Sequence, residues 1–339
     1  MKTKLLVLSF LLAAIGTLSA KVWTVSNNAV NAGHFTAIQS AADSAMAGDT
    51  IYVMGSPTDY GNVTIKCRVT MIGAGYALTG TQYNYYSEVD NIYIDSASFG
   101  QVVSGTKIMG FWVNSNFDYS GTSNISGVDV ERCYLNSTMY VNGPNWHIVN
   151  NDIYSIQVQY WNNTYIQNNF IEYIYYSNQT SVLIDHNNFV VTNGNMFSSV
   201  SNAIISNNIF WWGTPQNNVT SCVFSNNVTT YSTTINLPPA GNSGSNNNFS
   251  GASYFTDATI PAGNVGQNSI WNYKWTIKPA SAIHNSGSDG TDPGVYGGAY
   301  PMPNLTGATR IPQMVQLNVS GVAPAGGNLN VNFISKVQH

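Results

Sequence analysis

The residues best suited to chemistry are one arginine and three carboxylates that are close in the sequence. They are Arg132, Asp129, Glu131 and Asp152. A polysaccharide lyase needs a base beside carboxylates that hold calcium, and a glycosidase needs paired carboxyl groups. The alternative is an ion pair between neighbouring surface elements, which contributes little to stability. Few other groups converge on these four, so the ion pair is the favoured interpretation and catalytic residues stay unidentified.

A second candidate is the dipeptide Asp185-His186. Histidine titrates near neutral pH and serves in general acid–base catalysis. Related segments carry Gln-Asn and Val-Asn at the same place, so we interpret the dipeptide as a variant of a turn. The chain has no serine nucleophile motif and no phosphate-binding glycine loop.

The cysteines and histidines do not predict a metal or a disulfide framework. Cys67, Cys133 and Cys222 are odd in number and far apart, which favours three small buried side chains. No pair of histidines has metal-ligand spacing. The sequence predicts no cofactor; calcium stays open as a ligand, but no acidic loop indicates it.

Aromatic side chains are the more suggestive feature, since rings on a flat sheet can stack on sugars while polar neighbours bind hydroxyl groups. Equally, strand aromatics can stack on one another inside or along a sheet. The sequence does not decide between these two roles. The candidate ligand-binding residues are Tyr160, Trp161, Tyr175, Tyr176, Trp211 and Trp212.

The composition limits the class of protein. Charged residues make up only 8% of the chain, against roughly 25% in ordinary globular proteins. Asn, Ser, Thr, Gly, Tyr and Val replace them, which favours strands and turns. The formal net charge is -4, with no basic stripe, so a nucleic-acid partner is not expected.

A repeat organises the middle of the chain. Three segments, residues 147–154, 165–172 and 183–190, share an aliphatic residue, an Asn three places later and an apolar residue two places after that. Weaker copies occur at residues 69–73 and 108–113, and later ones follow with small insertions. The three columns are Ile148, Ile166 and Ile184; Asn151, Asn169 and Asn187; and Ile153, Ile171 and Phe189.

This repeat predicts a solenoid whose turns stack one strand spacing, about 4.8 Å, apart. The shared Asn suits a tight corner in the left-handed backbone region, and stacked Asn side chains can hydrogen-bond along the stack. A left-handed β-helix is not favoured, because six-residue steps from Ile148 do not give an aliphatic column. Leucine-rich and calcium-binding nonapeptide motifs are absent. The fold class is therefore all-β, a right-handed parallel β-helix.

The start of the chain carries a resemblance to a known family. Residues 35–53 read FTAIQSAADSAMAGDTIYV, an amphipathic helix with Ile38, Ala41, Ala42 and Ala45, followed by Gly48-Asp49 and a strand. This resembles the N-terminal cap of pectate-lyase-like β-helix proteins, which would cover the open end of the solenoid. Together with the Asn-rich repeats, the resemblance extends over roughly residues 35–230. It implies a fold, whereas it says little about function.

Both ends of the chain differ from the repeat. Residues 1–20 have the positive start, apolar run and small residues of a cleavable secretory signal, so we expect no membrane span after its removal. Residues 21–300 would form the solenoid, with a Gly-rich coil at residues 286–300 closing the stack. Residues 301–339 carry two alternating strand patterns and would pack on the solenoid or link it to a sorting module.

Three functions remain open at this point. The low charge and many aromatics favour a secreted or cell-surface β-helix that binds a polysaccharide or a surface without cleaving it. A divergent polysaccharide lyase or glycosidase is suggested by the fold resemblance alone. A purely structural surface protein is the third.

Overall fold

The structure is a computed structural model. It describes residues 20–28, 32–76, 85–95, 102–118, 125–158, 163–175, 178–190, 195–213, 218–230, 237–249, 254–261, 265–303, 313–319 and 331–336. The expected secretory signal therefore lies outside the described residues, except for Ala20.

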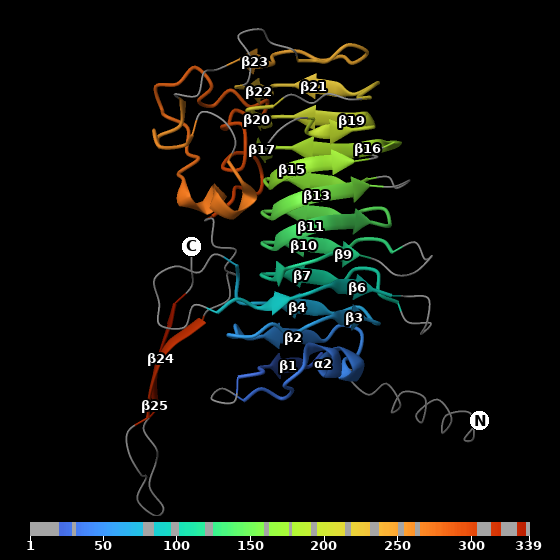
Figure 1. Ribbon diagram of the computed structural model, residues 1–339, viewed down its shortest axis with the longest axis vertical. Helices are drawn as coiled ribbons and strands as arrows, with labels where there is room; N and C mark the ends of the chain where they lie inside the picture. Colours follow the sequence, from blue (N-terminus) through green and yellow to red (C-terminus); the bar gives the residue numbers. More distant parts are fainter. Residues whose placement is uncertain are drawn as a thin grey trace, which may run out of the picture.

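Successive turns of the chain stack into a parallel β-solenoid (Figure 1). In the described part of the chain, ten strands form one parallel sheet, called sheet A here. The strands of sheet A, in spatial order, are β1 (Val22–Val25), β2 (Thr50–Val53), β4 (Thr70–Ile72), β7 (Lys107–Met109), β10 (Asp129–Glu131), β12 (His147–Val149), β14 (Tyr165–Gln167), β16 (Asn178–Asp185), β19 (Ser201–Ser206) and β21 (Val223–Ser225).

The second sheet, sheet B, has thirteen strands within the described ranges. Its ordered path comprises β3 (Val63–Ile65), β6 (Ile92–Ile94), β9 (Phe117–Asp118), β11 (Tyr134–Val141), β13 (Asp152–Val158), β15 (Phe170–Tyr175), β17 (Asn188–Val190), β20 (Ile209–Trp211), β22 (Val228–Thr229) and β23 (Asn248–Phe249). Three short strands pair beside this path: β5 (Glu88–Val89), β8 (Trp112–Val113) and β18 (Phe197–Ser198).

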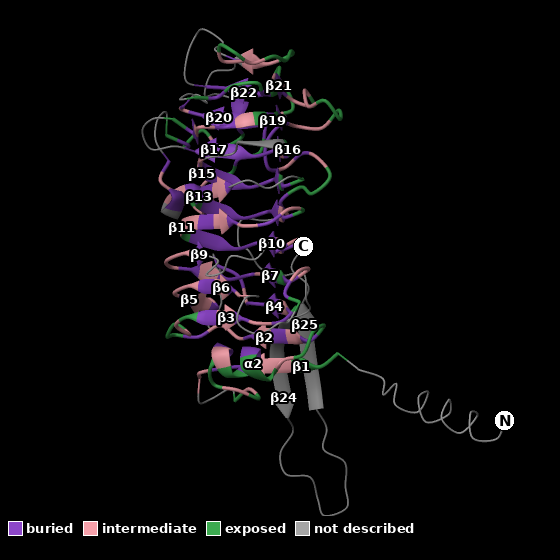
Figure 2. Ribbon diagram, turned by 90° about the vertical axis from the view of Figure 1, so that its right-hand side faces the viewer, coloured by how far each residue is buried: buried purple, intermediate pink, exposed green. Residues whose placement is uncertain are grey.

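The core lies between the sheets and follows the predicted columns. Ile148 pairs in register with Ile166, and Ile166 with Ile184. All three are fully buried, and Figure 2 shows buried residues, in purple, along the strands of the stack. The weaker copies also fall in register, since Met71 pairs with Ile108 and Ile108 with Val130. The solenoid predicted from the repeat is confirmed.

The shared asparagines form a buried ladder at the corner between the sheets. The ladder asparagines are Asn151, Asn169, Asn187, Asn208 and Asn227. In each step the amide donates to a strand carbonyl, as from Asn187 Nδ2 to Ile166 O at 2.8 Å. Its Oδ1 accepts from the backbone and side chain of the preceding rung, Asn169, at 2.9 and 3.0 Å. The predicted hydrogen bonding along the stack is confirmed.

The left-handed backbone, however, lies one residue before the ladder, so the prediction that placed it at the shared Asn was wrong. Positive φ angles of 53–59° occur at Arg132, Asn150, Asn168 and His186. The residue that turns the corner must take this conformation, while the ladder residue points its amide inward. The aligned Asp185-His186 dipeptide is thus a turn variant, as predicted.

The N-terminal helix also forms as predicted, at the end of the stack. Helix α2 (Ile38–Ser44) buries Ile38, Ala41 and Ala42 against the core, and Ala45 follows it as a partly buried residue. Asp49 then accepts hydrogen bonds from the Lys21 and Met46 backbone and the Trp23 indole, which join β1 to the first full turn.

The Gly-rich coil does not close the stack, which corrects the sequence prediction. Residues 254–261 and 265–302, called the C-terminal cover, lie along the side of the solenoid, shown in orange beside the strands in Figure 1. Their apolar side chains pack on outward residues of sheet B, including Phe170, Ile209 and Trp211. Part of the cover is a 3-10 helix, η2 (Gln267–Asn272).

The last strands and the cysteines match their predicted local features. Strand β24 (Gln313–Val319) pairs antiparallel with β25 (Val331–Lys336). Packing of this segment on the solenoid stays a prediction. Cys67, Cys133 and Cys222 are buried and free, as predicted.

The ladder generates a stability prediction. Replacing Asn187 by Ala would remove one donor each from the Ile166 and Asp185 carbonyls, and it would remove the shared acceptor of the Asn169 backbone and side-chain amides. Because each unpaired buried polar group costs about 1–3 kcal/mol, we expect a loss of at least about 3 kcal/mol in the free energy of unfolding. Urea denaturation measures it. Asn136→Ala, at an exposed position of β11, is the control, and an equally small loss in both variants would contradict the role given to the ladder.

Candidate functional site

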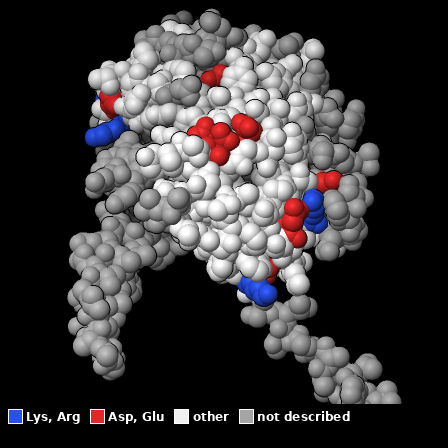
Figure 3. Space-filling model, turned by 60° about the horizontal axis from the view of Figure 1, so that its bottom comes forward, with Lys and Arg blue, Asp and Glu red and all other residues white. Residues whose placement is uncertain are grey.

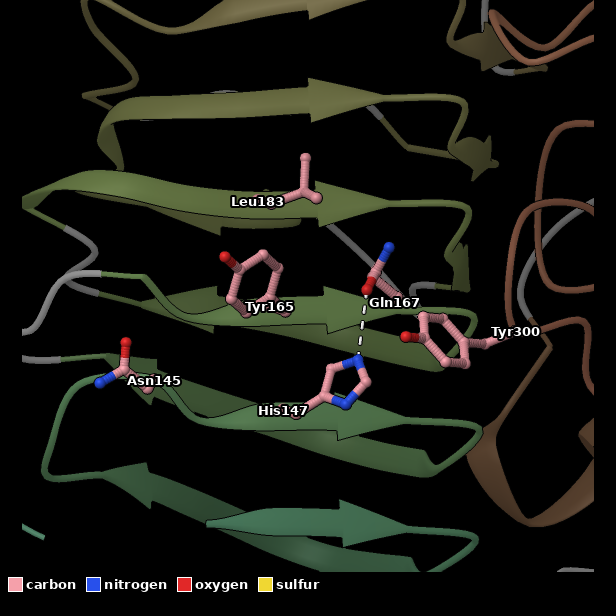
Figure 4. A pocket seen from close by; sticks show the side chains of 6 residues that line it. All are labelled: Asn145, His147, Tyr165, Gln167, Leu183 and Tyr300. Atoms are coloured by element: carbon pink, nitrogen blue, oxygen red, sulfur yellow. Dashed lines mark hydrogen bonds between the residues drawn. The ribbon is translucent and has the colours of Figure 1, made fainter. Parts of the chain in front are cut away.

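The described surface is hollowed on the outward face of sheet A. A cavity of about 470 Å³ lies across β12, β14 and β16 (Figure 4). Its lining, called the sheet A groove, consists of Asn145, His147, Tyr165, Gln167, Leu183 and Tyr300. Five of these residues come from the solenoid or its turns, whereas Tyr300 reaches the groove from the C-terminal cover.

Three rings in the groove are placed by strand register and by the cover. His147 and Tyr165 are paired neighbours on β12 and β14, with ring centroids 6.0 Å apart. Tyr300 meets the His147 ring edge-on at 5.0 Å. Tyr165 and Tyr300 are 41% and 44% exposed, so their faces are open to a ligand. His147 Nε2 lies 3.3 Å from Gln167 Oε1, which orients the imidazole.

A smaller hollow of about 270 Å³ continues the groove toward β10 and β7 and shares His147 and Tyr300 with it. The predicted candidates Asp129 and Glu131 line this part. Asp129 Oδ2 forms an ion pair with Lys107 Nζ at 2.6 Å. Glu131 Oε1 lies 3.0 Å from Arg132 Nε. The charges near the groove are therefore paired.

Arg132 is buried and does not lie on the surface, where the interpretation as a surface ion pair would place it. It occupies the left-handed corner position and is 5% exposed, because the corner turns its side chain against the body of the solenoid. Asp152 begins β13, so it lies on sheet B on the far side of that corner. The arginine and three carboxylates therefore do not converge on one open site.

Asp152 instead lies buried near Glu172 and near Gln267 of η2, and the two acidic side chains are called the buried carboxyl pair. The Asp152 side chain is almost fully buried, with the Gln267 side chain beside its carboxyl group. Glu172 Oε1 accepts from the Gln267 backbone at 3.2 Å, and Gln267 Nε2 donates to Leu135 O at 2.9 Å. The sequence analysis did not single out Glu172.

Burial favours the protonated form of both carboxyl groups. Burial raises the pKa of Asp152 well above its ordinary value; the nearby Gln267 amide opposes this, and Glu172 adds to it. Burial likewise raises the pKa of Glu172 to about 7, against the opposing hydrogen bond from Gln267. The pair is inaccessible to a polymer, so its chemistry concerns the attachment of the cover.

His186 makes a second attachment of the cover. Its Nδ1 lies 3.0 Å from Asp185 Oδ2, and its Nε2 lies 3.3 Å from Thr291 Oγ1 in the cover. Burial would raise the pKa of Asp185, but hydrogen bonds from His186, Ser206 and Asn207 hold it below its ordinary value. Gly298 packs against the imidazole so closely that an added Cβ would lie 2.8 Å from Nδ1. The dipeptide fastens the cover to the turn.

The aromatic candidates from the sequence differ in location and burial. Trp211 is fully buried between sheet B and the cover, 5.5 Å from the Phe255 ring, so its ring is not open to a ligand. Trp212 is half-buried against the cover. Tyr175 stacks on Tyr173 on sheet B, away from the groove. Tyr160, Trp161 and Tyr176 lie outside the described residues.

Sequence reasoning missed the groove residues His147, Gln167 and Tyr300, and it did not single out Tyr165. The register of the repeat contained part of the signal, because it places residues 147, 165 and 183 in one outward column. Tyr300 had no such signal, since the return of the cover to β12 is a long-range contact.

Other features of the described chain are limited. None of the described His, Cys, Asp and Glu side chains form a group of three that could hold a metal ion. No helix in the described ranges has the length and apolar character needed to span a membrane. On the face of the molecule drawn in Figure 3, charged side chains are few and scattered. Neither the models of known protein families nor the curated proteins contain a match to this chain.

The buried carboxyl pair predicts a pH-dependent stability. Below about pH 4.5 Glu172 is protonated in both folded and unfolded chains, and between 4.5 and about 7 only the unfolded chain ionises. The free energy of unfolding should therefore fall across this window, by on the order of 3 kcal/mol from Glu172. Asp152 acts in the same direction.

Urea denaturation at a series of pH values measures this fall. Glu172→Gln keeps the acceptor for Gln267 and cannot ionise, so its stability should vary less across the window. Glu88→Gln, at a half-exposed position on β5, is the control and should follow the parent. A parent curve that is flat, or that rises from pH 4.5 to 7, would rule out the protonated pair.

Proposed function

We propose that this protein is a secreted β-solenoid of the right-handed, pectate-lyase-like type that binds a polysaccharide in the sheet A groove without cleaving it. The observation that carries the proposal is the open arrangement of Tyr165, His147 and Tyr300 beside Gln167 and Asn145. Secretion is supported by the signal-like residues 1–20, and the handedness and family type by the cap and repeat.

The groove offers the two kinds of contact that sugars need. Ring faces bury the apolar C–H faces of a sugar, and amide groups hydrogen-bond its hydroxyls. Tyr165 and Tyr300 supply exposed faces, while Asn145 and Gln167 supply amides at the edges. These rings are held by strand register and by the cover, so binding needs little ordering of the site.

A lyase or glycosidase acting on the same surface is the alternative. It would have to use Asp129 and Glu131, the candidate carboxylates that line the hollow next to the groove. Both lie in ion pairs with basic residues, an arrangement that supports structure more than proton transfer. A structural surface protein, the third alternative, would bind no glycan at all.

The binding proposal is tested with Tyr165→Ala. Removing this exposed ring should weaken binding to a neutral polysaccharide about tenfold, the equivalent of about 1.4 kcal/mol. Affinity electrophoresis through gels containing soluble glucan, xylan or mannan measures the change. Tyr154→Ala is the matched control, because Tyr154 is similarly exposed, at 39%, but lies on sheet B. Equal effects of the two substitutions would contradict a site in the groove.

The catalytic alternative is tested with purified residues 21–339 on acidic and neutral polysaccharides, with and without calcium. Ultraviolet absorbance reports unsaturated lyase products, and reducing-end assays report hydrolysis. The binding proposal expects no product. Product formation that is lost in Asp129→Asn or Glu131→Gln would replace it with an enzyme.

A further inference from the structure

The groove is the middle of a longer column of outward side chains on sheet A. In-register pairs connect Asp129 to His147, His147 to Tyr165, and Tyr165 to Leu183. The column then continues through Leu183 to Ile204 and from Ile204 to Val223. Successive members are one strand spacing of about 4.8 Å apart, so the stretch from His147 to Val223 is about 19 Å long.

The chemical character of this column changes along the solenoid axis. It begins with the ion pair of Lys107 and Asp129 and passes to the rings of His147 and Tyr165. It then becomes aliphatic at Leu183, Ile204 and Val223, which we call the aliphatic ridge. Ile204 is 50% and Val223 42% exposed, which is unusual for adjacent branched residues on one sheet face.

Polar side chains run beside the ridge. The neighbouring outward positions, in register with one another, are Gln167, Asp185, Ser206 and Ser225. Ser206 Oγ donates to Asp185 Oδ1 at 2.7 Å, which holds these polar groups close to the sheet. An apolar stripe bordered by amide and hydroxyl groups matches a polymer that has apolar faces and hydroxyl edges.

The charges on this face select against an acidic polymer. The described cations nearest the groove, Lys107 and Arg132, are in ion pairs with Asp129 and Glu131. A carboxylated chain would have to displace a carboxylate from one of these pairs, and Asp185 would repel it. An uncharged chain has no such cost.

From this arrangement we infer that the ligand of the groove is an uncharged polysaccharide chain that lies along the solenoid axis. It contacts the rings of His147, Tyr165 and Tyr300 at one end and the aliphatic ridge at the other. The inference rests on the proposed glycan binding and adds the class, direction and length of the ligand. Affinity therefore increases with chain length until the chain spans the column.

The experiment is isothermal titration with soluble, neutral β-linked gluco-, xylo- and manno-oligosaccharides, from disaccharide to octasaccharide, and with oligogalacturonates of equal length. For at least one neutral series, affinity should rise with length and then level off. The double variant Ile204→Asp, Val223→Asp should lose about tenfold for the long chains and nothing for the disaccharide. Its unfolding transition verifies that the fold is intact.

The control is Val22→Asp. Val22 is an exposed aliphatic residue in the same outward column, 60% exposed, but lies beyond the Lys107–Asp129 pair at the other end of sheet A. This variant should bind every chain as the parent does. Sedimentation without glycan is measured for parent and variants, because a second copy of the chain is the other possible occupant of the ridge.

Each other outcome overturns a defined part of the inference. Affinity that does not depend on length, or a ridge variant that binds long chains as the parent does, removes the axial ligand while groove binding stands. Preference for oligogalacturonates removes the uncharged class. If the parent sediments as a dimer and the ridge variant as a monomer, the ridge is a surface for self-association. Absence of binding to every glycan, including the long polymers, overturns the proposed function itself.

Discussion

The hydrogen bonds of the buried ladder asparagines are the interaction on which the rest of this structure depends. At every turn the chain must change direction inside an apolar stack, where unpaired backbone groups are costly. Asn169 and Asn187 each donate to a strand carbonyl and accept from the amide groups of the previous rung. Because each rung is tied to the next, the turns are held in register, and every position of the repeat becomes a column.

The columns then divide the molecule into a covered side and an open side. On sheet B the outward side chains are large and apolar, such as Phe170 and Trp211, and the C-terminal cover buries them. On sheet A the outward column from His147 to Val223 stays partly or largely exposed, and Tyr300 of the cover lies at its border. The same register that builds the core therefore aligns the exposed rings and aliphatic residues in which we place ligand binding.

The sequence correctly predicted the features that recur in every turn of the solenoid. It did not predict contacts that occur only once. The columns of Ile148 and Asn151, the helix at residue 38 and the buried cysteines all follow from local pattern or periodicity. The position of the left-handed residue was off by one, since the repeat shows a polar pair at the corner without saying which member turns inward. Burial of Trp211, pairing of Asp152 with Glu172 and arrival of Tyr300 at His147 depend on the cover, whose path has no periodic signal.

The path of the cover also restricts how this molecule can evolve. Its polar contacts descend the stack in reverse order of sequence: Ser286 meets Asn226, Ser288 meets Asn207, Thr291 meets His186 and Gly297 meets Asn168. The cover thus contacts four consecutive corners of the stack, each through a different residue. Duplication or deletion of a single turn between Asn168 and Asn226 would shift all contacts beyond it by one rung. The cover also reaches earlier turns, where the Trp271 ring packs on Tyr76, Trp112 and Tyr134, so the same restriction on repeat number extends toward the N-terminus.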